Sequence, residues 1–323
     1  MDLALRPMST SQVLDRTFHI YRNHFALIAG IGAILPAMLL VMQLAFIPLG
    51  FPPRPAAKTP PETLAIVLLG YFCCYGVIYL IGNALAGGAT VVGVSKLHLG
   101  QGVTIGEAYR QVFARFWRIL GVIVLIGLIA FGSLLVGEVI AIIVIAFSAG
   151  SASIFARGST GLASIGVVVA VIWAIGVFMA AVFAALFFYS KLALAIPACI
   201  LEQLPVGVAL RRSWYLTKGS VGRIMLVNLL TWILSFVLGL VLTVPGQVLA
   251  ATLPNKALLL GLVLQHIGGF IAGVVAGPIA TTAIALIYYD QRVRKEAFDL
   301  QHMMDAMGQQ AVPPPQAAAP SIG

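Results

Sequence analysis

The chain is short of charge for its length. Only 9% of its 323 residues are Asp, Glu, Lys or Arg, whereas 61% are hydrophobic. A water-soluble protein needs many more charged side chains to cover its surface, so this composition excludes a soluble globular protein. It is typical of an integral membrane protein.

Residues that usually carry catalysis or bind metals are also scarce. The three cysteines, Cys73, Cys74 and Cys199, lie in or beside apolar stretches without metal-site spacing, so we interpret them as small buried hydrophobic residues. The five histidines do not cluster at metal-ligand spacing. The motifs His-Glu-x-x-His and Gly-x-Ser-x-Gly are absent, as is a phosphate-binding glycine loop. The sequence therefore predicts no enzyme, no metal site and no cofactor.

Six apolar stretches are long enough to cross a bilayer, since a membrane-spanning helix needs about 20 residues. They are residues 25–49, 64–94, 119–147, 162–189, 224–249 and 257–289. We predict an all-α, polytopic membrane protein with six transmembrane helices over residues 1–302. The remaining residues, 303–323, are rich in proline and alanine and are predicted to form a disordered tail.

One sequence pattern occurs three times, at intervals of roughly 95 to 100 residues. Each copy is an arginine-bearing amphipathic segment that runs directly into an apolar stretch, and the aligned arginines are Arg16, Arg110 and Arg211. We predict three repeated units, each with one helix lying along the membrane surface and two spans. Their approximate bounds are residues 9–95, 104–195 and 205–289.

Residues that begin helices precede all three amphipathic segments. Ser9 with Gln12, and Thr104 with Glu107, have the spacing of a capping box. Pro205 suits the first turn of the third segment, where a missing backbone N–H is tolerated.

Basic residues predict the orientation of the chain. If the amino terminus is inside, the inner segments hold 15 of the 19 Lys and Arg residues and the outer loops hold the other four: Arg54, Lys58, Arg157 and Lys256. Short cytoplasmic loops carry an excess of Lys and Arg, so we predict a multi-pass protein of the plasma (inner) membrane with both termini in the cytoplasm.

The amphipathic segments offer candidate binding sites for anionic phospholipid headgroups. The candidate residues are Arg16, Arg110, Arg211, Arg212 and Lys218. The same helices could instead only anchor the protein at the interface, without a specific headgroup site. In either case we expect membrane phospholipids, and not nucleic acid, as the partner of this basic surface.

Two ionisable residues fall inside predicted spans. Glu138 is the only acidic residue well within an apolar stretch, and His266 lies in the sixth span. A carboxylate at membrane depth is costly and therefore a functional candidate. A protonated glutamic acid that donates a hydrogen bond to a neighbouring helix is the alternative.

The last span ends in a run of alternating charges. On a helix, Asp290 can pair with Arg294 and Arg292 with Glu296, and Asp299 follows a few residues later. The run therefore predicts either a helix stabilised by its own ion pairs or a docking site for a cytoplasmic protein partner.

The same run resembles a family signature. Residues 288–300 follow the pattern Tyr-Tyr-Asp-x-Arg-x-Arg-x-Glu-x-x-Asp-Leu, which is similar to that of the family named for the membrane domain of glycerophosphoryl diester phosphodiesterases. Residues 195–202 and 209–220 are similar to another recurring stretch of that family, and residues 5–16 to its usual start. The resemblance covers about residues 3–302 and departs from the pattern at Ala297, where the family commonly has Gly.

The resemblance implies a membrane module and not the enzyme after which the family is named. In some members this module precedes a soluble phosphodiesterase domain, whereas many members are the membrane module alone. A barrel domain with acidic metal ligands would need about 250 residues, and we expect none here. Two functions remain open: a lipid-interacting or scaffold module, and a transporter of small solutes or ions that uses polar intramembrane residues.

Overall fold

A computed structural model describes residues 8–48, 61–155, 160–252 and 256–296 of the chain. These residues form α-helices and no β-strand. The helices are α1 (Thr10–Asn23), α2 (Phe25–Gly32), α3 (Ile34–Phe46), α4 (Pro61–His98), α5 (Ile105–Phe113), α6 (Phe116–Phe155), α7 (Thr160–Leu192), α8 (Ala195–Leu201), α9 (Val206–Thr217), α10 (Val221–Thr252) and α11 (Lys256–Glu296).

Five helical stretches are long and apolar enough to cross a membrane. They are Glu62–His98, Phe116–Phe147, Val168–Leu201, Val221–Thr252 and Leu258–Glu296. Helices α2 and α3 make a sixth if they are counted together as one bent span. The prediction of an all-α, polytopic membrane protein is thereby confirmed.

The first span is broken, which the sequence analysis did not predict. Helices α2 and α3 meet at Ala33 with a bend of 44°. Pro36 explains the break, because its ring lacks an N–H and collides with the carbonyl of the residue four positions earlier. That residue is Gly32, at which α2 ends.

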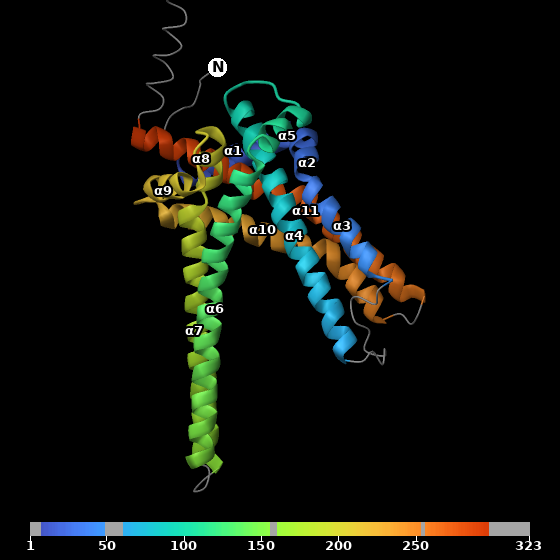
Figure 1. The fold of residues 1–323 in the computed structure, drawn as a ribbon, viewed down its shortest axis with the longest axis vertical. Helices are drawn as coiled ribbons and strands as arrows, with labels where there is room; N and C mark the ends of the chain where they lie inside the picture. Colours follow the sequence, from blue (N-terminus) through green and yellow to red (C-terminus); the bar gives the residue numbers. More distant parts are fainter. Residues whose placement is uncertain (1–7, 49–60, 156–159, 253–255, 297–323) are drawn as a thin grey trace, which may run out of the picture.

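The short helices gather at one end of the molecule (Figure 1). We call this region the head; it comprises α1, α5, α8, α9 and the carboxyl-terminal end of α11. From the head, α6 and α7 extend together as one long hairpin, while α3, α4 and the far ends of α10 and α11 extend in a different direction (Figure 1). Helices α4 and α6 therefore diverge with distance from the head.

The head has its own hydrophobic core. Val13 of α1, Leu216 of α9, Ile224 of α10 and Leu286 of α11 are fully buried in one cluster. A second cluster joins α4, α5, α6 and α8. In contrast, the α6–α7 hairpin exposes large apolar side chains along much of its length, as expected for helices surrounded by lipid.

Helices α10 and α11 approach each other closely through glycines. A Cβ atom on Gly268 would lie 2.1 Å from the carbonyl oxygen of Leu242, and one on Gly246 would lie 2.4 Å from the backbone nitrogen of Gln265. Such contacts are impossible for any other residue. Small residues at these positions let the two backbones pack directly, which is a common way to associate helices in lipid.

The predicted helix starts have the following outcomes. Ser9 forms the complete capping box with Gln12 on α1. The Thr104 hydroxyl accepts a hydrogen bond from the Glu107 N–H at 3.3 Å, and Pro205 is the N-cap of α9. The structure adds a short helix, α8, between the predicted fourth span and the third amphipathic segment, and the sequence analysis did not predict it.

One sequence prediction differs from the structure, and two others are not tested by it. Cys199 is buried as expected, but Cys73 and Cys74 are exposed on α4, so our interpretation of these two was wrong. Their exposed position suits a helix face that meets lipid. The tail at 303–323 lies outside the described residues, and the threefold repeat stays a prediction.

We expect Gly268→Ala to destabilise the protein by about 1–3 kcal/mol, because α10 and α11 must separate to admit the methyl group. Gly277→Ala is the matched control on the same helix, since a Cβ there meets nothing within 4 Å. Thermal unfolding of the purified protein in detergent measures both. Equal losses in the two variants would contradict the close-packing role of Gly268.

Candidate functional site in the head

A buried carboxylate organises one side of the head. The side chain of Asp290 on α11 is fully buried. It accepts hydrogen bonds from the Met8 N–H at 2.6 Å, from Arg223 Nη1 at 2.7 Å and from Arg294 Nε at 2.9 Å. Both arginines also donate to the Met8 carbonyl oxygen, at 2.8 Å and 2.6 Å. The start of the described chain, the start of α10 and the end of α11 thus meet at one carboxylate.

A second ion-pair network lies nearby on α11. Glu202, at the end of α8, accepts hydrogen bonds from Arg212 Nε at 2.9 Å and Nη2 at 2.9 Å, and also from the Tyr288 hydroxyl. Glu296 pairs with both Arg212 and Arg292. Burial disfavours the charge on Arg212, but its hydrogen bonds to Glu296 and Glu202 outweigh this and raise its pKa above the ordinary value. The network connects α8 and α9 to the carboxyl-terminal end of α11.

The end of α11 also caps α9. Lys295 Nζ donates to the carbonyl oxygens of Tyr215 at 2.7 Å and Lys218 at 2.8 Å, where α9 leaves its last carbonyls without helical partners. The predicted pairs Asp290–Arg294 and Arg292–Glu296 are both present. Asp299 lies outside the described residues.

Tyrosine hydroxyls satisfy carbonyls where helices are interrupted. Tyr109 of α5 donates to the Ile31 carbonyl beside the break between α2 and α3. Tyr21 of α1 donates at 2.7 Å to the Val275 carbonyl, in the turn of α11 that Pro278 weakens. Burial raises the pKa of both tyrosines to about 12, so both hydroxyls remain protonated donors at neutral pH.

The candidate headgroup residues have different environments. Arg110, Arg211 and Lys218 are exposed, and no ion pair joins them to an acidic residue in the described part of the chain. Arg212 forms ion pairs with Glu202 and Glu296. Arg16 is half-buried, and its Nε has no hydrogen-bond partner among the described residues. Three of the five candidates are therefore free to meet a lipid headgroup.

Exposed aromatic side chains accompany these three cations. In the sequence, Phe113 and Trp117 follow Arg110, and Trp214 and Tyr215 lie between Arg211 and Lys218. The rings of Trp214 and Tyr215 lie under the ammonium groups of Lys191 and Lys295. Trp117 is 80% exposed, the highest value for a tryptophan among the described residues. Tryptophan and tyrosine prefer the level of the headgroups, because the rings are apolar and the N–H or O–H can hydrogen-bond.

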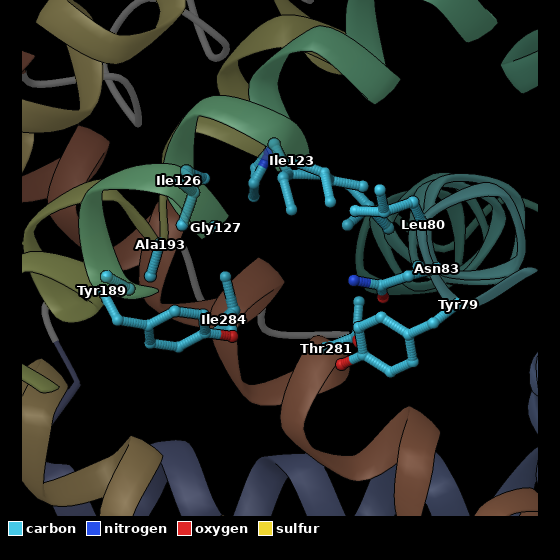
Figure 2. Close-up of a pocket in the computed structure, with 15 residues that line it drawn as sticks. Tyr79, Leu80, Asn83, Ile123, Ile126, Gly127, Tyr189, Ala193, Thr281 and Ile284 are labelled. Atoms are coloured by element: carbon cyan, nitrogen blue, oxygen red, sulfur yellow. The ribbon is translucent and has the colours of Figure 1, made fainter. Parts of the chain in front are cut away.

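A pocket of about 200 Å³ lies next to the head, where α4 and α6 begin to diverge. Its wall is formed by residues of α4, α6, α7, α8 and α11, and Figure 2 shows Asn83, Tyr79 and Tyr189 among its few polar residues. Its other side chains are mainly apolar, among them Ile123 and Ile126. The sequence analysis did not predict this pocket, because its residues come from distant parts of the chain.

The intramembrane candidates lie elsewhere. Glu138 is exposed on α6, and His266 is half-buried on α11. No hydrogen bond or ion pair joins them in the described structure, and neither lines the pocket. In the described residues, His, Cys, Asp and Glu do not gather in groups of three that could hold a metal ion.

The fold and the apolar spans define a multi-pass, all-α membrane protein. A family model described as "Membrane domain of glycerophosphoryl diester phosphodiesterase" matches residues 167–313, which confirms the resemblance for that part of the chain. The matched part contains α8 to α11 and therefore both ion-pair networks. No curated protein and no solved structure matches the chain. The description is that of the membrane domain, not of the catalytic phosphodiesterase domain.

We expect Asp290→Asn to destabilise the protein by about 3 kcal/mol or more, because it leaves two arginines beside an uncharged amide in a buried site. Asp15→Asn is the control: Asp15 is exposed on α1 and forms no ion pair in the described structure. Thermal unfolding in detergent compares the two variants. If both unfold at the wild-type temperature, the Asp290 network does not hold the head together.

Proposed function

We propose that the protein is a lipid-interacting membrane module, without catalytic activity, whose head binds anionic phospholipid headgroups. The observation that carries this proposal is that exposed cations without an ion pair on and just after α5 and α9 lie close in sequence to exposed aromatic side chains on α5, the start of α6 and α9. Arg110, Arg211 and Lys218 supply the positive charge. Each basic residue near an anionic membrane surface contributes about 1 kcal/mol to binding.

The internal ion pairs support this choice of residues. Arg212 forms ion pairs with Glu202 and Glu296, and Arg223 and Arg294 form ion pairs with Asp290. These pairs connect the helices of the head to one another. The exposed cations are not needed for that purpose. Because the aromatic rings close to them in sequence favour the headgroup level, phosphate groups are the partners that fit this surface best.

We also propose that the head faces the cytoplasm at the plasma (inner) membrane. The described residues that produce the strong basic bias of the sequence lie in the head helices or in the span ends beside them. Positive residues are retained on the cytoplasmic side during insertion, and that leaflet also carries most anionic lipid.

A scaffold role with a protein partner at the end of α11 remains part of the proposal. Asp290 is buried and Glu296 is paired with Arg212, so neither is available to a partner as a free charge. Arg294 is the more accessible of the paired residues, with 37% of its side chain exposed. A partner would therefore contact the flank of α11 that carries Arg294.

Transport is the other function left open by the sequence. A path for ions or protons would need charged or titratable groups that face a common space. The residues that line the described pocket include no carboxylate, lysine, arginine or histidine, and Glu138 is exposed on α6 and does not line it. These observations favour the lipid-interacting module.

We expect the triple variant Arg110→Gln, Arg211→Gln, Lys218→Gln to lose its preference for phosphatidylglycerol over phosphatidylcholine, since about 1 kcal/mol is lost for each charge. The protein is placed in nanodiscs with equal amounts of the two lipids. Native mass spectrometry then measures the lipids that remain bound.

The matched control removes three charges from loops predicted to lie on the opposite side: Arg54→Gln, Lys58→Gln and Arg157→Gln. It should keep the preference. If both triple variants behave alike, net charge and not the head determines lipid selection, and the proposal is wrong.

We expect Glu138→Gln to leave folding and the cellular phenotype unchanged, because a lipid-interacting module needs no titratable group at that position. Insertion is checked by expression and by gel filtration in detergent. Loss of the phenotype in a folded, inserted Glu138→Gln protein would favour ion-coupled transport instead.

A further inference from the structure

The pocket where α4 and α6 begin to diverge contains polar groups without a hydrogen-bond partner among the described residues. The Asn83 amide and the hydroxyls of Tyr79 and Tyr189 have no hydrogen-bond partner among the described residues. In Figure 2, Asn83 and Tyr189 reach toward the pocket from opposite walls, with Tyr79 beside Asn83. These polar atoms are not among the fully buried ones, so they are accessible to a molecule in the pocket, and a molecule that supplies hydrogen-bond acceptors suits this arrangement.

The lining also defines the chemistry of that molecule. All its residues are uncharged at neutral pH, so the group that it holds is uncharged. Asn83, Tyr79 and Tyr189 can each donate a hydrogen bond, and carbonyl oxygens accept such bonds. The apolar remainder, with Ile123 and Ile126, suits a hydrocarbon chain attached to that carbonyl.

The depth of the pocket agrees with this chemistry. Tyr189 lies two residues from Lys191, and Ile284 lies six residues before Asp290, which is about 9 Å along a helix. The pocket thus lies just inside the level of the charged head. In a phospholipid, the glycerol ester groups occupy this level, directly beneath the headgroup.

The size of the pocket limits how much of the lipid it can enclose. An apolar cavity of about 150 Å³ binds benzene, so a pocket of this size takes on the order of ten non-hydrogen atoms. That corresponds to an ester group and the first few methylenes. The rest of the chain can lie between α4 and α6, which diverge beyond the pocket (Figure 1).

We propose that this pocket binds the glycerol ester region of a phospholipid, with Asn83, Tyr79 and Tyr189 as donors to the oxygen atoms of its ester groups. This deepens the proposed function and rests on it for the class of ligand. The pocket itself is independent of headgroup charge, because the charged residues of α5 and α9 do not line it.

The test uses a phosphatidylcholine with a photoactivatable diazirine on the first carbons of one acyl chain. The full-length protein is placed in nanodiscs of unlabelled phosphatidylcholine with a small proportion of the probe. After illumination, mass spectrometry of the digested protein maps the labelled residues. We expect labels on the pocket segments of α4, α6 and α7.

Gly127→Leu places a side chain at the pocket, since Gly127 lines it and a Cβ there meets nothing within 4 Å. Gly132→Leu is the matched control: it lies about 1.4 turns further along α6 and outside the pocket, and a Cβ there also meets nothing within 4 Å. Labelling of the pocket should fall about fivefold or more in Gly127→Leu and stay unchanged in Gly132→Leu.

The hydrogen bonds are tested separately by Tyr189→Phe combined with Asn83→Leu, with Tyr75→Phe as the control on α4 outside the pocket. The double variant should lose labelling to a similar extent, and the control should not. Unchanged pocket labelling in Gly127→Leu, or labels spread evenly along the exposed faces of α6 and α7, would overturn the proposal.

The two proposals can fail independently. Because phosphatidylcholine has no net charge, loss of the phosphatidylglycerol preference has no effect on this experiment. A pocket that labels normally in a protein without headgroup preference would leave the ester site in place and remove the anionic headgroup site.

Discussion

The buried carboxylate of Asp290 is the interaction on which the arrangement of the head depends. It joins Met8, Arg223 and Arg294, which are 282, 67 and 4 residues away in the sequence. Lipid chains are as apolar as the helices they surround, so hydrophobic burial gives little preference for one helix arrangement over another. A charge that is satisfied in only one arrangement supplies that preference. The start of α1 and α10 is fixed relative to α11 for this reason.

Interrupted helices are stabilised in the same way, by polar groups that reach across from another element. Pro36 and Pro278 each remove one backbone hydrogen bond from a span. An unpaired carbonyl in a membrane is costly unless another donor is near. Tyr109 and Tyr21, each on a short head helix, donate to the carbonyls of Ile31 and Val275, which are next in sequence to the carbonyls of Gly32 and Val274 that the two prolines leave without a helical partner. The head therefore holds together spans that their own backbones would leave weakened.

The sequence predicted those features that depend on short separations along the chain. Apolar length identified the spans, and a spacing of four residues identified the pairs Asp290–Arg294 and Arg292–Glu296. The break at Ala33 followed from Pro36 but was not predicted, because a proline early in an apolar stretch is often tolerated.

Long-range contacts were beyond such reasoning. Glu202 lies 86 residues from Tyr288, and nothing in its neighbourhood indicates which helix it will meet. The aligned arginines show the same limit: Arg110 and Arg211 are exposed, whereas Arg16, on α1 of the head, is half-buried. Equivalent positions in a pattern thus differ in environment, because the environment depends on neighbours that the pattern does not contain.

The pocket and the ion-pair network share one short element, α8. Ile196 and Pro197 in its first half contribute to the wall of the pocket, and Glu202 at its end accepts hydrogen bonds from Arg212 and Tyr288. A helix of only seven residues thus carries pocket-lining residues in its first half and the carboxylate that pairs with Arg212 at its end. Helix α8 thus connects the ion-pair network of the head with the pocket that we propose holds a lipid ester.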